Sequence, residues 1–262
     1  MSLTITADEA AETPAATLGA LKIEARSVQD CAEGLVRYCL SGRRHLATRP
    51  YFSTSVNGQV VSLLARDRRL APMLAKADAI NADGQPMVLL SRLLCRSPLP
   101  ERVATTDLFP AVAERAAKEG LTFYLLGGRE AVSRKAAEAI QAAYPGLKIV
   151  GRRHGYFDRF EEAAISAEIA SLKPDFLWVA LGAPREHQFC MRNLVRLKGV
   201  GVVKTAGGLF DFLSGEKARA PKWMQTAGFE WLFRVLVEPR RLFLRYALTN
   251  PHAMLVMLRD LR

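Results

Sequence analysis

Three apolar runs that end close to glycine constrain the fold of this chain more than any other feature. They are LTFYLLGG, DFLWVALGAP and residues 200–203, which precede Gly207 and Gly208. Short apolar runs bounded by glycine are typical of buried strands. Helical patterns at residues 131–144 and 160–172 separate the first two runs. Strands alternating with helices at this spacing predict parallel pairing. We therefore expect an α/β fold with a Rossmann-like, mostly parallel sheet flanked by helices.

The same alternation extends toward the N-terminus. Strands are predicted at residues 21–25, 51–56 and 79–81, and helices at residues 28–40, 57–64 and 86–94. We expect three parts: a disordered tail over residues 1–20, a Rossmann-like domain over residues 21–215, and an amphipathic, basic, helical appendage over residues 216–262.

Cysteine and histidine usage argues against a disulfide framework and against a metal site. The four cysteines show no C-x-x-C spacing, and only four histidines accompany them. Residues 1–20 lack a signal-peptide pattern, and no window approaches the roughly 18 apolar residues of a membrane span. We expect a reduced, cytoplasmic protein without a transmembrane helix.

The net charge of +11 is densest near the C-terminus, where residues 216–262 hold nine Lys and Arg against four Asp and Glu. Such a segment can face the phosphates of nucleic acid or of anionic lipid. Its arginines are interleaved with aromatic and aliphatic residues between Trp223 and Tyr246, which suits a membrane interface. The alternative is an ordinary helix packed on its own domain. Both interpretations stay open, because a helix can dock with one face and meet lipid with the other.

Polar residues and glycines gather where the predicted strands end. Carboxyl ends of parallel strands meet at one edge of a sheet, and that edge is the expected ligand site. The residues placed there are Ser55, Asn57, Asp83, Gly127, Gly128, Gly182, Gly207 and Gly208.

Two acidic residues at this edge have both a structural and a functional interpretation. Asp83, in NADGQP, is either a turn or cap residue or a general base. Asp211 lies in the first turn of a short helical pattern, where it is either part of a cap or part of a nucleotide pocket.

Sequence motifs for phosphate binding are weak or missing. LLGG lacks the full G-x-G-x-x-G spacing, and the chain holds neither a P-loop motif nor a D-x-D motif. A bound phosphate would therefore have to be neutralised by backbone N–H groups and arginines.

Nine collinear segments between Ser53 and Arg245 resemble one known family. They include AKADAINADGQPMV, LPERVATTDL, PDFLWVALGAPREHQF, AGGLFDFLSGEKARAPKW and GFEWLFRVLVEPRR. The chain resembles the WecG/TagA/CpsF group, glycosyltransferase family 26. The resemblance implies a Rossmann-like core of the GT-E type with a C-terminal appendage that meets the membrane. It also implies an inverting, metal-independent enzyme, without a cofactor, that moves a sugar from a UDP-sugar to a polyprenyl-diphosphate-linked acceptor.

The resemblance also implies roles for single residues. Asp83 would be the general base, beside Ser55 and Asn57, while Arg234 and Arg241 would reach the pyrophosphate. A separation of seven residues would place both arginines on one face of a helix. The implied UDP site consists of Gly127, Gly128, Gly182, Pro184, Glu186, Gly207, Gly208, Asp211 and Arg102.

Some positions depart from the family pattern and leave donor selectivity open. Glu186 and His187 stand where the family usually has Gln-Glu, and Thr105 stands in place of a glycine. A third appendage arginine is expected near Leu244, and Arg245 is its neighbour. Ser55 falls where the family commonly has threonine. His187 is either a catalytic residue or one that lines the pocket or the surface.

The function implied by this resemblance is glycosyl transfer in bacterial envelope or exopolysaccharide synthesis, at the inner face of the cell membrane. The expected partners are a UDP-sugar, a lipid-linked glycan acceptor and an anionic membrane surface, without nucleic acid. A monomer and a homo-oligomer both remain open. The alternatives are a nicotinamide-dependent Rossmann oxidoreductase, which the weak glycine motif disfavours, and a basic nucleic-acid-binding module, whose affinity would fall steeply with salt.

Overall fold

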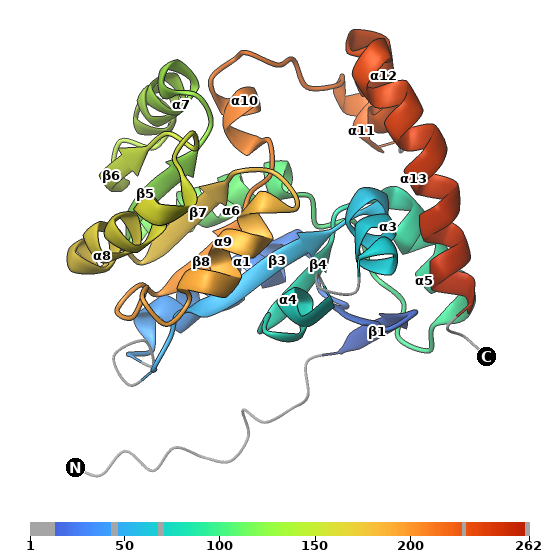
Figure 1. The fold of residues 1–262 in the computed structure, drawn as a ribbon, viewed down its shortest axis with the longest axis horizontal. Coiled ribbons are helices and arrows are strands. Elements are labelled where there is room, and N and C mark those ends of the chain that lie inside the picture. Colours follow the sequence, from blue (N-terminus) through green and yellow to red (C-terminus); the bar gives the residue numbers. More distant parts are fainter. Residues whose placement is uncertain (1–13, 43–46, 68–70, 227–228, 260–262) are drawn as a thin grey trace.

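The computed structural model describes residues 14–42, 47–67, 71–226 and 229–259. Within these residues the chain forms a six-stranded parallel sheet with the strand order β4-β3-β8-β7-β5-β6 (Figure 1). The strands are β3 (Tyr51–Val56), β4 (Ala79–Ala82), β5 (Thr122–Gly127), β6 (Lys148–Arg153), β7 (Phe176–Ala180) and β8 (Val202–Thr205). The predicted Rossmann-like α/β sheet is therefore confirmed.

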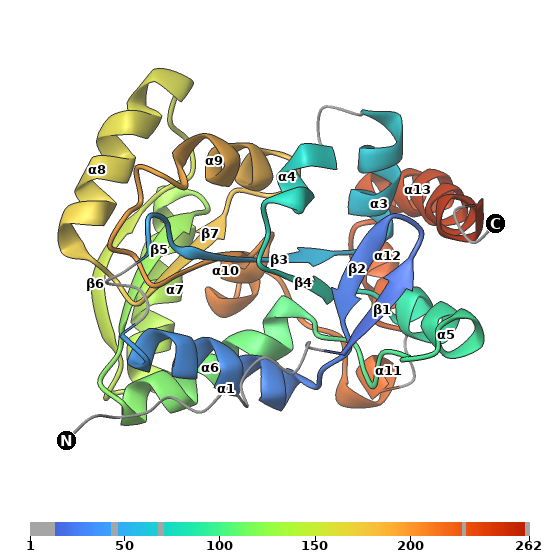
Figure 2. The ribbon, with the colours of Figure 1, turned by 90° about the horizontal axis from the view of Figure 1, so that it is seen from below.

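Helices cover both faces of this sheet. On one face, α1 (Val28–Leu40), α6 (Thr105–Lys118) and α7 (Glu130–Ala143) share an apolar core with alternate residues of the strands. On the other face, α8 (Glu162–Leu172), which follows the short 3₁₀ helix η2 (Arg159–Glu161), packs with α9 (Arg185–Asn193). Figure 2 shows α1 and α6 on one side of the sheet and α8 and α9 on the other. Because both faces are covered, the strands read as continuous apolar runs.

The strand predicted at residues 200–203 begins and ends two residues later, at Val202 and Thr205. Gly201 lies in the turn that enters the strand, where an added Cβ would meet the carbonyl oxygen of Asp175 at 2.5 Å. At the other end, Lys204 and Thr205 are buried within the sheet. The strand therefore continues past the apolar run, through two buried polar residues.

The prediction that residues 1–20 form a disordered tail is wrong where the structure describes them. The strands β1 (Ala15–Leu18) and β2 (Leu21–Glu24) pair as a separate antiparallel ribbon. Ala16 and Leu18 are completely buried in a cluster that includes residues of α3 (Gly58–Arg66) and α5 (Gln85–Leu94). Burial of these apolar side chains stabilises the short strand. The charge and polarity of the N-terminal sequence do not predict this burial. Residues 1–13 lie outside the described residues.

The C-terminal segment is helical, as predicted. It contains α11 (Lys222–Thr226), α12 (Glu230–Val237) and α13 (Pro239–Arg259). Two short helices of the core, α4 (Ala71–Ala75) and α10 (Leu209–Leu213), precede it in the chain. Figure 1 shows α13 lying alongside α3, and its residues Ala253 and Met257 join the cluster that buries β1. Among the described residues, no helix combines the length and the apolar character needed to cross a membrane.

The expectation that Arg234 and Arg241 share one helix face is wrong. α12 ends at Val237, and Glu238 adopts φ −128° and ψ 62°, which is not helical. α13 then begins at Pro239, a position where proline costs no helical hydrogen bond. The two arginines therefore belong to different helices.

Candidate active site

A cavity of about 1110 Å³ lies at the carboxyl ends of the parallel strands. Its floor consists of core residues that follow β3, β4, β5, β7 and β8, and α12 and α13 form its wall. We call these two parts the floor and the wall. The volume is at the upper end of what small-molecule sites usually have, which suits a ligand as large as a nucleotide with a second substrate.

The cavity brings together most of the site residues that the sequence predicts. Those that line it are Ser55, Asn57, Asp83, Arg102, Gly128, Gly182, Glu186, Gly207, Gly208, Asp211 and Arg234. Gly127 and Pro184 lie next to lining residues without lining the cavity themselves. The side chain of Arg241 is outside the part of the chain that the structure describes, so its predicted position stays a prediction.

Gly127 has a packing role at the end of β5. Its φ is +142°, and an added Cβ would lie 2.2 Å from the carbonyl oxygen of Ala180 on the neighbouring β7. Only glycine allows this approach of the two strands. Gly127 therefore shapes the floor, and its neighbour Gly128 meets the cavity.

Asp83 follows β4 directly and lies in the floor, held by a hydrogen bond of 2.7 Å from its backbone N–H to the Val56 carbonyl oxygen. The cap position of the next helix is occupied by Gly84, so Asp83 is not the helix cap that one interpretation expects. Burial raises the pKa of the Asp83 carboxyl to about 6, and the positive charges of Arg102 and Arg234 partly oppose this rise. A carboxylate with this pKa is ionised at neutral pH and more basic than an ordinary aspartate.

Glu186 ties two glycine turns of the floor together. Its Oε2 atom accepts hydrogen bonds from the backbone N–H groups of Gly182, at 3.1 Å, and Gly207, at 2.9 Å. Burial raises the pKa of Glu186 to about 7. Because both hydrogen bonds go to the backbone, this side chain fixes the shape of the site.

Neighbouring polar residues of α9 and α3 have structural roles. His187 is buried, its Nε2 atom lies 3.0 Å from the Thr54 hydroxyl oxygen, and burial lowers its pKa to about 4. This pKa keeps His187 neutral at pH 7. Because it is buried and does not line the cavity, it has a structural role, and its predicted place in the pocket or at the surface is wrong. Asn57 does line the cavity, and its side-chain oxygen caps α3 by accepting from the Val60 N–H at 3.1 Å.

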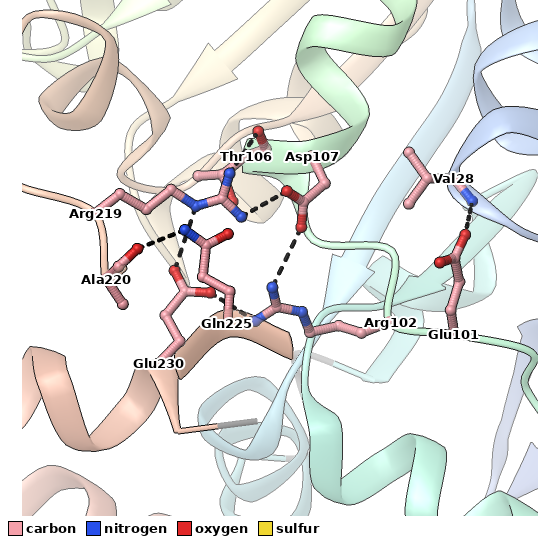
Figure 3. Close-up of polar contacts among 9 residues, drawn as sticks. All are labelled: Val28, Glu101, Arg102, Thr106, Asp107, Arg219, Ala220, Gln225 and Glu230. Carbon is pink, nitrogen blue, oxygen red and sulfur yellow. Dashed lines mark hydrogen bonds and ion pairs between the residues drawn. The ribbon is translucent and has the colours of Figure 1, made fainter. Parts of the chain in front are cut away.

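Arg102 joins the core to the wall (Figure 3). Its guanidinium group donates to Glu230 of α12 at 2.8 Å and to Asp107 of α6 at 3.2 Å. Arg219 donates to the other oxygen of Asp107 at 2.6 Å. Arg102 therefore lines the cavity as predicted, but its charge is already engaged by two carboxylates.

Asp211 and Arg234 make further contacts between core and appendage. Lys217 pairs with Asp211 at 2.9 Å and with Glu238 at 3.3 Å. The guanidinium carbon of Arg234 lies 5.6 Å from the centre of the Phe212 ring, within the range of a cation–π contact. Arg234 is thereby placed beside the floor from the appendage side.

Lys204 is a residue near the site that sequence reasoning missed. It lies in β8, and its Nζ atom donates to the hydroxyl oxygen of Ser55 at 2.8 Å and to the side-chain oxygen of Asn81 at 3.1 Å. A lysine inside an apolar strand is itself a signal, because unpaired charges are almost never buried. Glu230 was missed for another reason, since only the folded appendage brings it to Arg102.

Metal ligands do not cluster in the part of the chain that the structure describes. No group of three or more His, Cys, Asp or Glu side chains is arranged there to hold an ion. Among the described residues, the positively charged side chains that line the cavity are Arg102, Arg129, Arg185, Lys217 and Arg234.

A parallel sheet whose glycine turns, basic carboxylate and arginines surround one large cavity is typical of the class of α/β enzymes that bind a ligand at the carboxyl ends of the strands. Sequence comparison agrees with this class. The chain belongs to the WecG/TagA/CpsF family of glycosyl transferases, whose family model matches residues 17–262. It is therefore a glycosyltransferase, and the two alternative classes, the oxidoreductase and the nucleic-acid-binding module, are set aside.

One curated relative is similar over most of its length. The N-acetylglucosaminyldiphosphoundecaprenol N-acetyl-beta-D-mannosaminyltransferase of Bacillus subtilis (strain 168) is 31% identical over 188 residues. The aligned part covers 72% of this chain and 72% of the relative.

Proposed function

We propose that this enzyme transfers a sugar from a UDP-sugar to a polyprenyl-diphosphate-linked N-acetylglucosamine, with inversion at the anomeric carbon and without a metal ion. The family supports glycosyl transfer, and the name of the Bacillus subtilis relative supports an acceptor of this chemistry. The single observation that carries the proposal is Asp83, a carboxylate of raised pKa in the floor of a cavity that has room for both substrates.

Asp83 acts as the general base in this mechanism. Its carboxylate accepts the proton of an acceptor hydroxyl while that oxygen attacks the anomeric carbon of the donor. The bond from the anomeric carbon to the diphosphate oxygen breaks on the opposite face, and its electron pair leaves with UDP. A pKa of about 6 suits this role, because the group is mostly ionised at neutral pH and still basic enough to take the proton.

Arginines and backbone N–H groups stabilise the leaving diphosphate. Arg234 is the first choice because it lines the cavity, and Arg241 of α13 is proposed as its partner. Arg102 contributes less, since Glu230 and Asp107 already bind its guanidinium group. The glycine turns of the floor supply N–H donors to phosphate oxygens, including those at Gly128 and Gly208. Fixed donors of this kind stabilise charge that develops in the transition state.

In this proposal, the appendage would hold the cavity at the cytoplasmic surface of the cell membrane. Apolar side chains of α12 and α13 are exposed, among them Leu236 at 69% and Phe243 at 61%, while Leu242 of α13 is buried. A helix with one docked face and one exposed apolar face, flanked by arginines, suits an interface with anionic lipid. This position would give the enzyme access to an acceptor that is held in the lipid.

A panel of donors with one acceptor tests the proposal. The purified full chain is incubated with UDP-N-acetylmannosamine, UDP-N-acetylmannosaminuronate, UDP-glucuronate or UDP-glucose and a short-chain prenyl-diphosphate-linked N-acetylglucosamine. We expect one donor to give a disaccharide product with an inverted linkage, at a rate that EDTA does not change. Absence of product with every donor, or loss of activity on chelation that manganese or magnesium restores, would contradict the proposal.

A further inference from the structure

Lys204 is a fully buried lysine directly beneath the floor. Its side chain has 0% exposure, and β8 is a central strand between β3 and β7. Lys204 points to the face of the sheet that α1 covers, as do Ser55 of β3 and Asn81 of β4, which its ammonium group contacts. A buried ammonium group is costly unless it is hydrogen-bonded. Its position therefore calls for a role that an apolar residue could not fill.

The hydrogen bonds around Lys204 fix the direction of the Ser55 hydroxyl. An ammonium group only donates, so the Ser55 oxygen must accept at 2.8 Å from the Lys204 Nζ atom. The Ser55 proton must then point elsewhere. Within the described residues, the other contact of this hydroxyl is the Thr105 hydroxyl oxygen, at 3.4 Å. That distance is long for an O–H···O bond, so the proton stays available to a ligand in the cavity that Ser55 lines.

We propose that Lys204 is a positioning residue whose ammonium group makes the Ser55 hydroxyl donate its proton into the cavity, toward an oxygen of the nucleotide-sugar donor. This assignment rests on the proposed function of the site. Lys204 acts through Ser55 and does not itself line the cavity. Asn81 holds the ammonium group from the other side, because its side-chain oxygen accepts a second proton at 3.1 Å.

Loss of the Lys204 proton reverses the hydrogen bond. A neutral amine carries a lone pair, so Ser55 can then donate to Lys204 and turn its proton away from the cavity. Burial lowers the pKa of Lys204 to about 8, while nearby acidic groups oppose the change. The titratable groups that face it are Glu24 of β2, Cys31 of α1, Asp83 after β4, and Glu186 and His187 of α9. Positioning by Lys204 is complete only well below pH 8, and it is lost as pH rises through that value.

A double-mutant cycle on the full chain tests whether Lys204 acts through Ser55. Transfer rates and calorimetric affinities for the donor are measured for Lys204→Met, Ser55→Ala and the double variant. We expect each single substitution to lower kcat/KM about tenfold. The double variant should lose about tenfold as well, because residues that act as a unit are not additive. Ser55→Thr, which keeps the hydroxyl, should recover most of what Ser55→Ala loses. The exposed Lys198→Met serves as the matched control and should match the wild type.

The pH profile gives a readout that a purely structural lysine would not move. In the wild type, kcat/KM and donor affinity should fall above pH 8, and this fall should be absent in Ser55→Ala. If Lys204→Met does not fold, the presence or absence of the alkaline fall in Ser55→Ala decides whether Lys204 acts through Ser55. A double variant whose kcat/KM falls about a hundredfold, or an alkaline fall that persists in Ser55→Ala, would overturn the assignment.

If the wild type transfers no sugar, the proposed function fails. Donor affinity still tests Lys204 in that case, since a wild-type affinity unchanged above pH 8 would overturn its role.

Discussion

The floor of the cavity is held by backbone hydrogen bonds within the sheet, whereas the wall is attached to the core through side chains. In the floor, the N–H of Ala206 donates to the Val179 carbonyl oxygen at 2.7 Å, and the N–H of Gly128 donates to Ala180 at 3.2 Å. The wall is joined by the Arg102–Glu230 ion pair, at 2.8 Å, and by a contact of 3.0 Å between the Ser62 hydroxyl and His252 of α13. Backbone groups, two of which donate to the Glu186 carboxylate, fix the floor. The wall is attached by pairs of side chains, so a single substitution can remove one of its attachments.

In the proposed mechanism, this difference separates two tasks of the enzyme. Proton transfer needs a base at a fixed position, and Asp83 lies in the floor. The proposed contact with a lipid-held acceptor needs an exposed apolar surface, and the wall has exposed apolar side chains. Substitutions in the floor should therefore affect the chemical step, and those in the wall should affect leaving-group stabilisation and membrane contact.

The largest expected effect is that of Asp83→Asn in the floor. An amide keeps the shape of the side chain but cannot accept the proton, so turnover should fall by roughly a hundredfold to ten-thousandfold. Affinity for UDP, measured by calorimetry, should change little. The exposed Glu138→Gln on α7 is a matched control and should retain full turnover. Turnover like that of the wild type in Asp83→Asn would remove Asp83 from the mechanism.

In the wall, Arg234→Ala and Arg241→Ala should each lower turnover at least tenfold, about 1.4 kcal/mol of transition-state stabilisation. The assay uses a soluble acceptor analogue, so that membrane binding does not contribute. The exposed Arg240→Ala is the control and should change turnover little. If Arg234→Ala and Arg241→Ala were impaired only on liposomes, these arginines would bind the membrane and leave the diphosphate to other groups.

A smaller effect concerns stability. The pKa of Asp83 in the folded protein, about 6, lies above its ordinary value of 3.8, so ionisation of this group destabilises the folded state. That cost is absent below pH 3.8 and fully present above pH 6, where it is at most about 3 kcal/mol. Asp83→Asn should therefore melt a few degrees higher than the wild type at pH 7.5, and scanning calorimetry should show the difference shrinking toward pH 4. A variant that melts lower at pH 7.5 would mean that the carboxylate is a structural partner.

The sequence predicts the floor better than the wall, for a physical reason. Apolar runs that end in glycine determine both the buried strands and the turns that follow them, so Gly182 and Gly207 were placed correctly by pattern. The wall depends on contacts between distant residues. Glu230 reaches Arg102 across 128 positions. The non-helical Glu238 separates α12 from α13, which the seven-residue spacing of Arg234 and Arg241 does not reveal. Lys204 was missed because its polar partners, Ser55 and Asn81, come from strands that only the folded sheet makes neighbours.

The acid side of the pH–rate profile tests the central claim most directly, that a carboxylate in the floor takes the acceptor proton. kcat/KM is measured with the soluble acceptor analogue between roughly pH 4.5 and roughly pH 7.5, a range that extends about 1.5 pH units on either side of the Asp83 pKa of about 6. The rate should fall with decreasing pH through about 6, because protonated Asp83 cannot act as a base. Glu186→Gln removes the other carboxyl of raised pKa, about 7, and the fall near pH 6 should persist in it. A rate that stays flat through pH 6, or an acid limb that disappears in Glu186→Gln, would contradict the assignment of Asp83 as the base.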